Sequence, residues 1–157
     1  MQSSWKNLFF TLALPLMVGA FSALLTQNTM ETFAALNQPP LSPPGWVFPV
    51  VWTILYVMMG LASYFMLAAD AEDAQRDRAW DLYGFQLLLN FLWSLLFFRF
   101  DRCDLALICL ILLWVVLIAT IISFFRISRK AGLSLIPYLL WVTFAGYLNI
   151  GFCVWNP

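Results

Sequence analysis

Five long apolar segments limit what this chain can fold into more than any other feature of its sequence. They cover approximately residues 6–26, 46–69, 79–98, 105–125 and 133–155. A helix needs about 20 mostly apolar residues to cross the hydrocarbon core of a bilayer, and each segment is near that length. Because lipid offers no hydrogen-bond partners, a spanning segment must pair its own backbone groups. We predict an all-α membrane protein, a single-domain bundle of five transmembrane helices.

The composition excludes an ordinary soluble domain. Hydrophobic residues make up 63% of the chain and charged residues 10%, whereas soluble domains average about 45–50% and about 25%. The formal net charge is zero and there is no basic tract, so nucleic acid is not an expected partner. The chain has no histidine, the commonest metal ligand and general base. We therefore expect no metal site and no required cofactor.

The connections between the segments differ in character. The longest, residues 27–45, cannot form a continuous helix because it contains Pro39, Pro40, Pro43 and Pro44. We expect a short helix from Thr29 to Leu36, capped by Thr29, and interpret the connection as a structured lid. Residues 70–78 are expected to form a charged, helix-compatible turn. The link 99–104 is so short that the third and fourth segments should be antiparallel neighbours.

Basic residues are distributed unevenly between the two ends of the predicted bundle. One end has Arg99 and Arg102, and the other has Lys6, Arg76, Arg78, Arg126, Arg129 and Lys130. Lysine and arginine are enriched in cytoplasmic connections of membrane proteins. We expect a bacterial cell membrane, and for such a membrane the count predicts a cytoplasmic N-terminus and an external C-terminus.

The three cysteines give little indication of a role. Cys103, Cys109 and Cys153 lie in or beside apolar segments and form no CxxC pair. We interpret them as small buried apolar side chains rather than as disulfide partners or metal ligands.

Three of the predicted helices place aromatic, amide or small side chains at helical spacing. These sets are Trp52 with Tyr56, Gln86 with Asn90 and Trp93, and Trp141 with Ala145 and Leu148. Residues three or four apart share a helix face, and an amide in hydrocarbon must find a partner or face a cavity. Two interpretations remain open, namely ordinary helix packing and the lining of a ligand pocket in which Ala145 leaves room.

Other functional classes have little support. No span contains Asp or Glu away from its ends, and five unrepeated helices do not divide into matched halves, so active secondary transport is disfavoured. No GxSxG or HExxH motif and no phosphate-binding glycine loop occurs. Conventional hydrolase and nucleotide chemistry are therefore not predicted.

Five stretches of sequence carry a family resemblance. They are LNQP at 36–39, PPGWVFPVVWTILY at 43–56, QLLLNFLW at 86–93, PYLLW at 137–141 and FAGYLN at 144–149. In this order they resemble the TspO/MBR family, which includes tryptophan-rich sensory proteins, mitochondrial translocator proteins and peripheral benzodiazepine receptors. Two positions depart from that pattern. Leu41 stands where the family usually has a tryptophan, and no Lys or Arg follows Tyr147 to complete a cholesterol motif.

The resemblance implies a five-helix bundle, commonly a homodimer, that binds protoporphyrin IX, haem and other hydrophobic ligands in an aromatic pocket. The family's ligand contacts fall on Trp46, Val47, Trp52, Asn90, Trp93, Trp141, Ala145 and Leu148. Together with Tyr56, which shares a predicted helix face with Trp52, these are the predicted ligand-binding residues. We assign no catalytic residue, because ligand binding of this kind needs no catalysis.

Three functions are compatible with the sequence and with the family resemblance. The first is a membrane receptor or carrier for tetrapyrroles with a sensory or transport role. The second is an enzyme that degrades porphyrin in the light, with Trp52 and Trp141 as electron or radical donors. The third is a ligand-responsive regulator that acts through a partner protein.

Overall fold

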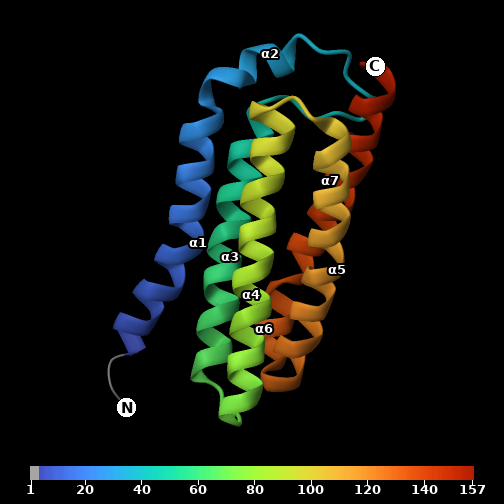
Figure 1. Cartoon of the computed structure of the whole chain (residues 1–157). Helices are drawn as coiled ribbons and strands as arrows, with labels where there is room; N and C mark the ends of the chain where they lie inside the picture. The colour runs from blue at the N-terminus through green and yellow to red at the C-terminus, as the bar shows by residue number, and fades with distance from the viewer. Residues whose placement is uncertain (1–3) are drawn as a thin grey trace.

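The computed structural model describes residues 4–157, which form a bundle of helices without strands (Figure 1). The helices in chain order are α1 Ser4–Thr26, α2 Met30–Ala34, α3 Val47–Ala68, α4 Asp73–Ser94, α5 Cys103–Ile127, α6 Arg129–Ser134 and α7 Ile136–Trp155. A 3-10 turn, η1 Gln27–Thr29, joins α1 to α2, and a π-helical turn, η2 Leu95–Arg99, extends α4. The predicted all-α class is confirmed.

Five helical stretches are long and apolar enough to cross a membrane, which confirms the predicted number. They are Ser4–Thr29, Val47–Ala68, Asp73–Arg99, Cys103–Ile127 and Arg129–Trp155. The chain is an integral membrane protein. Helix α1 begins and helix α7 ends at opposite ends of the bundle in Figure 1, as an odd number of spans requires.

Two span boundaries, the starts of the third and the fifth, differ from the prediction by more than three residues. The third span begins at Asp73, so most of the expected charged turn is the first part of α4. This stretch lacks Gly and Pro, and an acidic residue at a helix N-terminus is favoured by the helix dipole. The last span consists of α6 and α7, which are separated at Leu135 just before Pro137 in the first turn of α7.

The helices pack in a regular order around a shared core. Helix α4 packs directly on α5, as the short link between them predicted, while α5 also packs on α7 and α1 on α3. Helices α1 and α3 approach each other closely at Gly60, which has no side chain. A Cβ atom at this position would lie only 2.8 Å from the backbone Cα of Leu12. Fully buried core side chains include Met59, Tyr83, Leu113, Phe124 and Tyr138.

Residues 27–46, which we call the lid, cross one end of the bundle from α1 towards the C-terminus (Figure 1). The lid contains a short helix, as predicted, although α2 covers only Met30–Ala34. Thr29 occupies the N-cap position of α2, as predicted, but the expected capping hydrogen bond is not made. The Thr29 side chain makes no cap hydrogen bond, because its hydroxyl donates instead to the Thr26 carbonyl at 2.7 Å, within the preceding turn.

Candidate functional site

A cavity of about 90 Å³, which we call the deep cavity, opens between α1, α3 and α4 near the lid end of the bundle. Its lining includes four of the predicted binding residues together with small and polar side chains of α1. These are Trp52, Tyr56, Asn90 and Trp93, with Gly19, Ser22 and Thr26. The aromatic pair of α3, Trp52 and Tyr56, therefore faces Asn90 and Trp93 of α4 across one space.

A buried hydrogen-bond chain orients the amide in this cavity. The Tyr56 hydroxyl donates to Oδ1 of Asn90 at 2.8 Å, and Nδ2 of Asn90 donates to the Tyr138 hydroxyl at 2.7 Å. Asn90 and Tyr138 are at most 1% exposed. An amide has two N–H groups and two oxygen lone pairs, so Asn90 keeps one donor and one acceptor for a further partner.

Trp52 is the centre of the aromatic wall. Its ring centroid lies 5.7 Å from that of Tyr56 and 5.9 Å from that of Trp93. Tyr138 and Trp141 lie farther out at 6.2 and 6.5 Å, both edge-on. These separations fall within the range in which aromatic rings attract each other, about 4.5–7 Å. Since Trp52 is only partly buried, its remaining surface is free to contact a ligand in the deep cavity.

A second and larger cavity, of about 690 Å³, lies beneath the lid, and we call it the lid cavity. Lid residues Phe33, Gln38, Ser42 and Gly45 line it on one side. It shares Ala23, Thr26, Phe48 and Pro49 with the deep cavity. The two spaces adjoin, and the larger alone falls within the range of about 300–1,000 Å³ typical of small-molecule pockets.

The other predicted residues lie outside these two cavities. Trp46 is 68% exposed, and Val47 is partly buried without lining either space. Trp141 borders an apolar groove of about 380 Å³ between α3 and α7. Ala145 and Leu148 border a space of only about 10 Å³, packed against Trp93, Phe33 and other apolar side chains. The predicted residues of α7 therefore pack against Trp52 and Trp93 without lining the deep cavity or the lid cavity.

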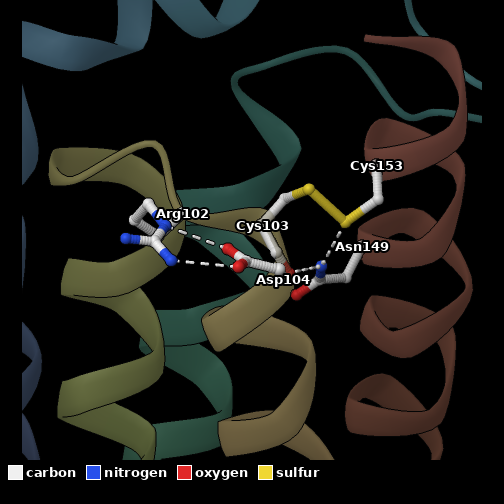
Figure 2. Close-up of polar contacts among 5 residues, drawn as sticks. All are labelled: Arg102, Cys103, Asp104, Asn149 and Cys153. Carbon is white, nitrogen blue, oxygen red and sulfur yellow. Dashed lines mark hydrogen bonds and ion pairs between the residues drawn. A yellow bond between two sulfur atoms is a disulfide. The ribbon is translucent and has the colours of Figure 1, made fainter. Parts of the chain in front are cut away.

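One end of the bundle carries a disulfide that corrects the interpretation of the cysteines. Cys103 begins α5 and Cys153 lies in the last turn of α7, with their Cα atoms 5.6 Å apart and their sulfur atoms bonded (Figure 2). This separation suits a disulfide. The predicted buried apolar role is wrong for these two, because antiparallel helices bring their ends together. Cys109 is buried and free, as expected.

Asn149 connects this disulfide to the deep cavity. The indole N–H of Trp93 donates to Oδ1 of Asn149 at 3.1 Å. Nδ2 of Asn149 in turn donates to the Cys103 carbonyl at 3.0 Å and lies 3.6 Å from Sγ of Cys153 (Figure 2). Asn149 and Tyr138 lie in the family-like stretches of sequence, but neither was assigned a role from the sequence. Their partners come from other helices, so no local pattern identifies them.

The cavities are electrically neutral. No charged side chain lines the deep cavity or the lid cavity. Charged contacts lie outside them, as in the pair of hydrogen bonds of 3.1 and 3.0 Å from Arg102 to Asp104. These bonds and the carboxylate charge raise the pKa of the exposed Arg102 guanidinium. Within residues 4–157, no group of three or more His, Cys, Asp or Glu is arranged to hold a metal ion. The arrangement is suited to holding an apolar, flat ligand with polar edges.

Known proteins resemble the whole bundle. Residues 11–155 match the model of the family described as TspO/MBR. The chain is 39% identical over 125 residues to the tryptophan-rich protein TspO of Chlorobaculum tepidum, covering 80% of this chain and 79% of that protein. It is 40% identical over 119 residues to the tryptophan-rich sensory protein of Cereibacter sphaeroides, covering 76% and 73%. It is 35% identical over 150 residues to the translocator protein of Homo sapiens, covering 94% and 86%.

Proposed function

The chain belongs to the TspO/MBR family, and on that premise we propose that it is a membrane receptor or carrier that binds tetrapyrroles such as protoporphyrin IX in the cavities beneath the lid. The observation that carries this proposal is the meeting of Trp52, Trp93 and the oriented Asn90 amide around one neutral space. The adjoining lid cavity of about 690 Å³ supplies room that the deep cavity lacks.

Apolar burial would provide most of the binding free energy. A flat macrocycle that leaves water for an aromatic pocket gains about 25 cal/mol for each Å² of apolar surface buried. Stacking against Trp52 would add a geometric preference for planar ligands. The free N–H and lone pair of Asn90, and the lid side chains Gln38 and Ser42, would address the polar edge of the ligand.

Haem and metal-free porphyrin would bind through the same surfaces. The residues lining the two cavities include no His, Cys or Met, which are usual haem iron ligands. The hydroxyl of Tyr56, the one tyrosine in the lining, donates to Asn90. We therefore propose recognition of the macrocycle rather than of its iron, so that protoporphyrin IX and haem should have similar affinities.

Quenching of tryptophan fluorescence by protoporphyrin IX tests this function. The full chain in detergent should be quenched to saturation at a defined stoichiometry, and Trp52→Ala should weaken binding about tenfold or more, as loss of a well-packed aromatic contact does. Trp114→Phe is the matched control, because Trp114 lies on α5 and bonds to Thr143 away from both cavities. Unsaturable quenching proportional to detergent partitioning would rule the proposal out.

A second candidate function is light-dependent oxidation of bound porphyrin by dioxygen. It is favoured by the edge-on contact between Trp52 and Trp141, whose ring centroids are 6.5 Å apart, and by the buried Trp141 indole N–H, which lacks a hydrogen-bond partner among residues 4–157. Trp52 would face the excited ligand, and Trp141 could then return an electron to it.

Illumination separates binding from degradation. If the protein degrades porphyrin, the complex in aerated buffer should convert the porphyrin absorption spectrum to that of a product, while free porphyrin under the same light should not. Trp141→Phe should slow conversion and leave the dissociation constant unchanged, since Trp141 lines neither cavity. Full conversion by this variant would remove Trp141 from the mechanism, and no conversion by the wild type would leave binding alone.

A further inference from the structure

The lid is attached mainly to the last turns of α7. The Tyr147 hydroxyl donates to the Pro40 carbonyl at 2.6 Å. The Asn37 backbone N–H donates to Oδ1 of Asn156 at 2.9 Å, and Nδ2 of Asn156 donates back to the Asn37 carbonyl at 3.0 Å. The position of the end of α7 therefore influences how closely the lid covers the cavities.

Close packing strengthens this attachment. A Cβ atom on Gly151 would lie 2.5 Å from Cβ of Pro39, so the Pro39 ring of the lid packs against α7 where glycine leaves room for it. The Phe33 ring of the lid lies 4.6 Å from the Phe152 ring of α7, centroid to centroid. Phe33 also contacts Phe97 and Phe98 of η2. The lid thus closes on a surface built jointly by α7 and η2.

The disulfide holds that surface together. Cys153 lies between Gly151 and Asn156, within the segment that carries the lid, and is bonded to Cys103 at the start of α5 (Figure 2). Helix ends fray more readily than helix centres. A covalent bond at this point therefore restrains the turn of α7 on which the lid rests.

Asn149 extends the connection to the ligand site. It lies one turn before Cys153, accepts a hydrogen bond from the cavity-lining Trp93 and donates one to the carbonyl of Cys103. Movement of α7 relative to α5 would break or lengthen these bonds. The orientation of the Trp93 indole then depends on whether the two helix ends stay together.

The disulfide can be reached from outside the bundle. Cys103 borders a polar cavity of about 580 Å³, together with the exposed residues Asn37 and Asp101 and with Asn156. Both cysteines are partly rather than fully buried. A small thiol can therefore approach a sulfur atom without unfolding the helices.

We propose that the Cys103–Cys153 disulfide is a reversible redox site whose reduction by a dithiol loosens the lid and releases the ligand, an inference that rests on the proposed binding function. A thiolate of the reductant attacks one sulfur, forms a mixed disulfide and expels the other sulfur, which takes a proton. The second thiol of the reductant then displaces the first sulfur. In total the protein gains two electrons and two protons, and the reductant becomes a disulfide.

Hydrogen exchange of the lid tests the coupling without any ligand. The full chain in lipid nanodiscs is compared after treatment with diamide and with dithiothreitol, and free thiols are counted by maleimide labelling after denaturation. The diamide-treated protein should have one free thiol, that of Cys109. Reduction should add two thiols and speed amide exchange in residues 27–46. The proposal would be overturned if reduction exposed the two new thiols but left the amide exchange rates of residues 27–46 unchanged. It would also be overturned if the diamide-treated protein had three free thiols.

Dissociation of protoporphyrin IX tests the effect on the ligand. Reduction should speed it about tenfold, equivalent to losing roughly one hydrogen bond of lid closure. The double variant Cys103→Ser/Cys153→Ser should dissociate fast with or without dithiothreitol, whereas Cys109→Ser should respond like the wild type. An equal dissociation rate in both redox states would refute ligand control. The oxidised protein could also fail to bind porphyrin while reduction still speeds hydrogen exchange of the lid. That result would refute the proposed binding function and the control of ligand release, but not the coupling of the disulfide to the lid.

Discussion

The indole N–H of Trp93, in the wall of the deep cavity, donates a 3.1 Å hydrogen bond to Oδ1 of Asn149, which is fully buried on α7. The other side of the Asn149 amide donates to the carbonyl of Cys103 on α5. One side chain thus joins three helices near the lid end. It also fixes the direction in which the Trp93 ring faces the cavity.

Replacing Asn149 should therefore affect both stability and binding. In Asn149→Leu, the Trp93 indole loses its acceptor and the Cys103 carbonyl loses a donor. A buried unpaired group costs about 1–3 kcal/mol, so the apo protein should melt at a lower temperature and bind protoporphyrin IX more weakly. Thr143→Val is the matched control, since it removes the acceptor of the exposed Trp114 indole. Equal effects of the two variants would contradict a special role for Asn149.

The position of Ala145 predicts a packing defect rather than a blocked pocket when the residue is enlarged. Ala145 is 4% exposed and borders a space of only about 10 Å³. Ala145→Phe should overpack this region and cost about 1–3 kcal/mol or more. Ala23→Phe is the comparison, because Ala23 is exposed and borders both cavities. It should weaken porphyrin binding and hardly change the melting temperature of the apo protein. The reverse pattern would assign the ligand site to α7.

Gln86 gives a prediction of increased stability. It is fully buried on α4, and neither its Nε2 nor its Oε1 atom has a hydrogen-bond partner among residues 4–157. Gln86→Leu has a similar volume and removes the unpaired amide, so thermal unfolding of the apo protein should shift upwards by the equivalent of about 1–3 kcal/mol. Asn90→Leu, which removes two hydrogen bonds, should shift it downwards. A lower melting temperature for Gln86→Leu would show that its amide is hydrogen-bonded in the membrane.

The membrane orientation is also testable. The disulfide lies at the same end as Arg99 and Arg102, opposite the larger group of basic residues. Disulfides persist in oxidising compartments, so the position of the disulfide and the charge count predict the same orientation, with the lid end outside the cytoplasm. Alkaline phosphatase, which is active only outside the cytoplasm, should be active when fused after Pro157 and inactive when fused at Ser128. The opposite activities would reverse the orientation.

Hydropathy alone determined the number of spans and the bundle class. Each of the five segments is long enough to cross a bilayer, and in lipid each must pair its backbone internally as a helix. Spacing paired Trp52 with Tyr56 and Asn90 with Trp93, because residues three or four apart share a helix face, and both pairs line the deep cavity. The same reasoning could not place Trp141, because spacing within a helix does not reveal which neighbour its face meets.

Only the tertiary structure decided which side chains from different helices meet. Cys103 and Cys153 are separated by 50 positions and form a disulfide because the ends of α5 and α7 coincide. The Trp93–Asn149 and Asn90–Tyr138 hydrogen bonds likewise join residues on different helices. Helix formation depends on local sequence and on the lipid solvent, whereas these contacts depend on the rotation and axial position of each helix in the bundle. Those are set by the packing of all the helices together.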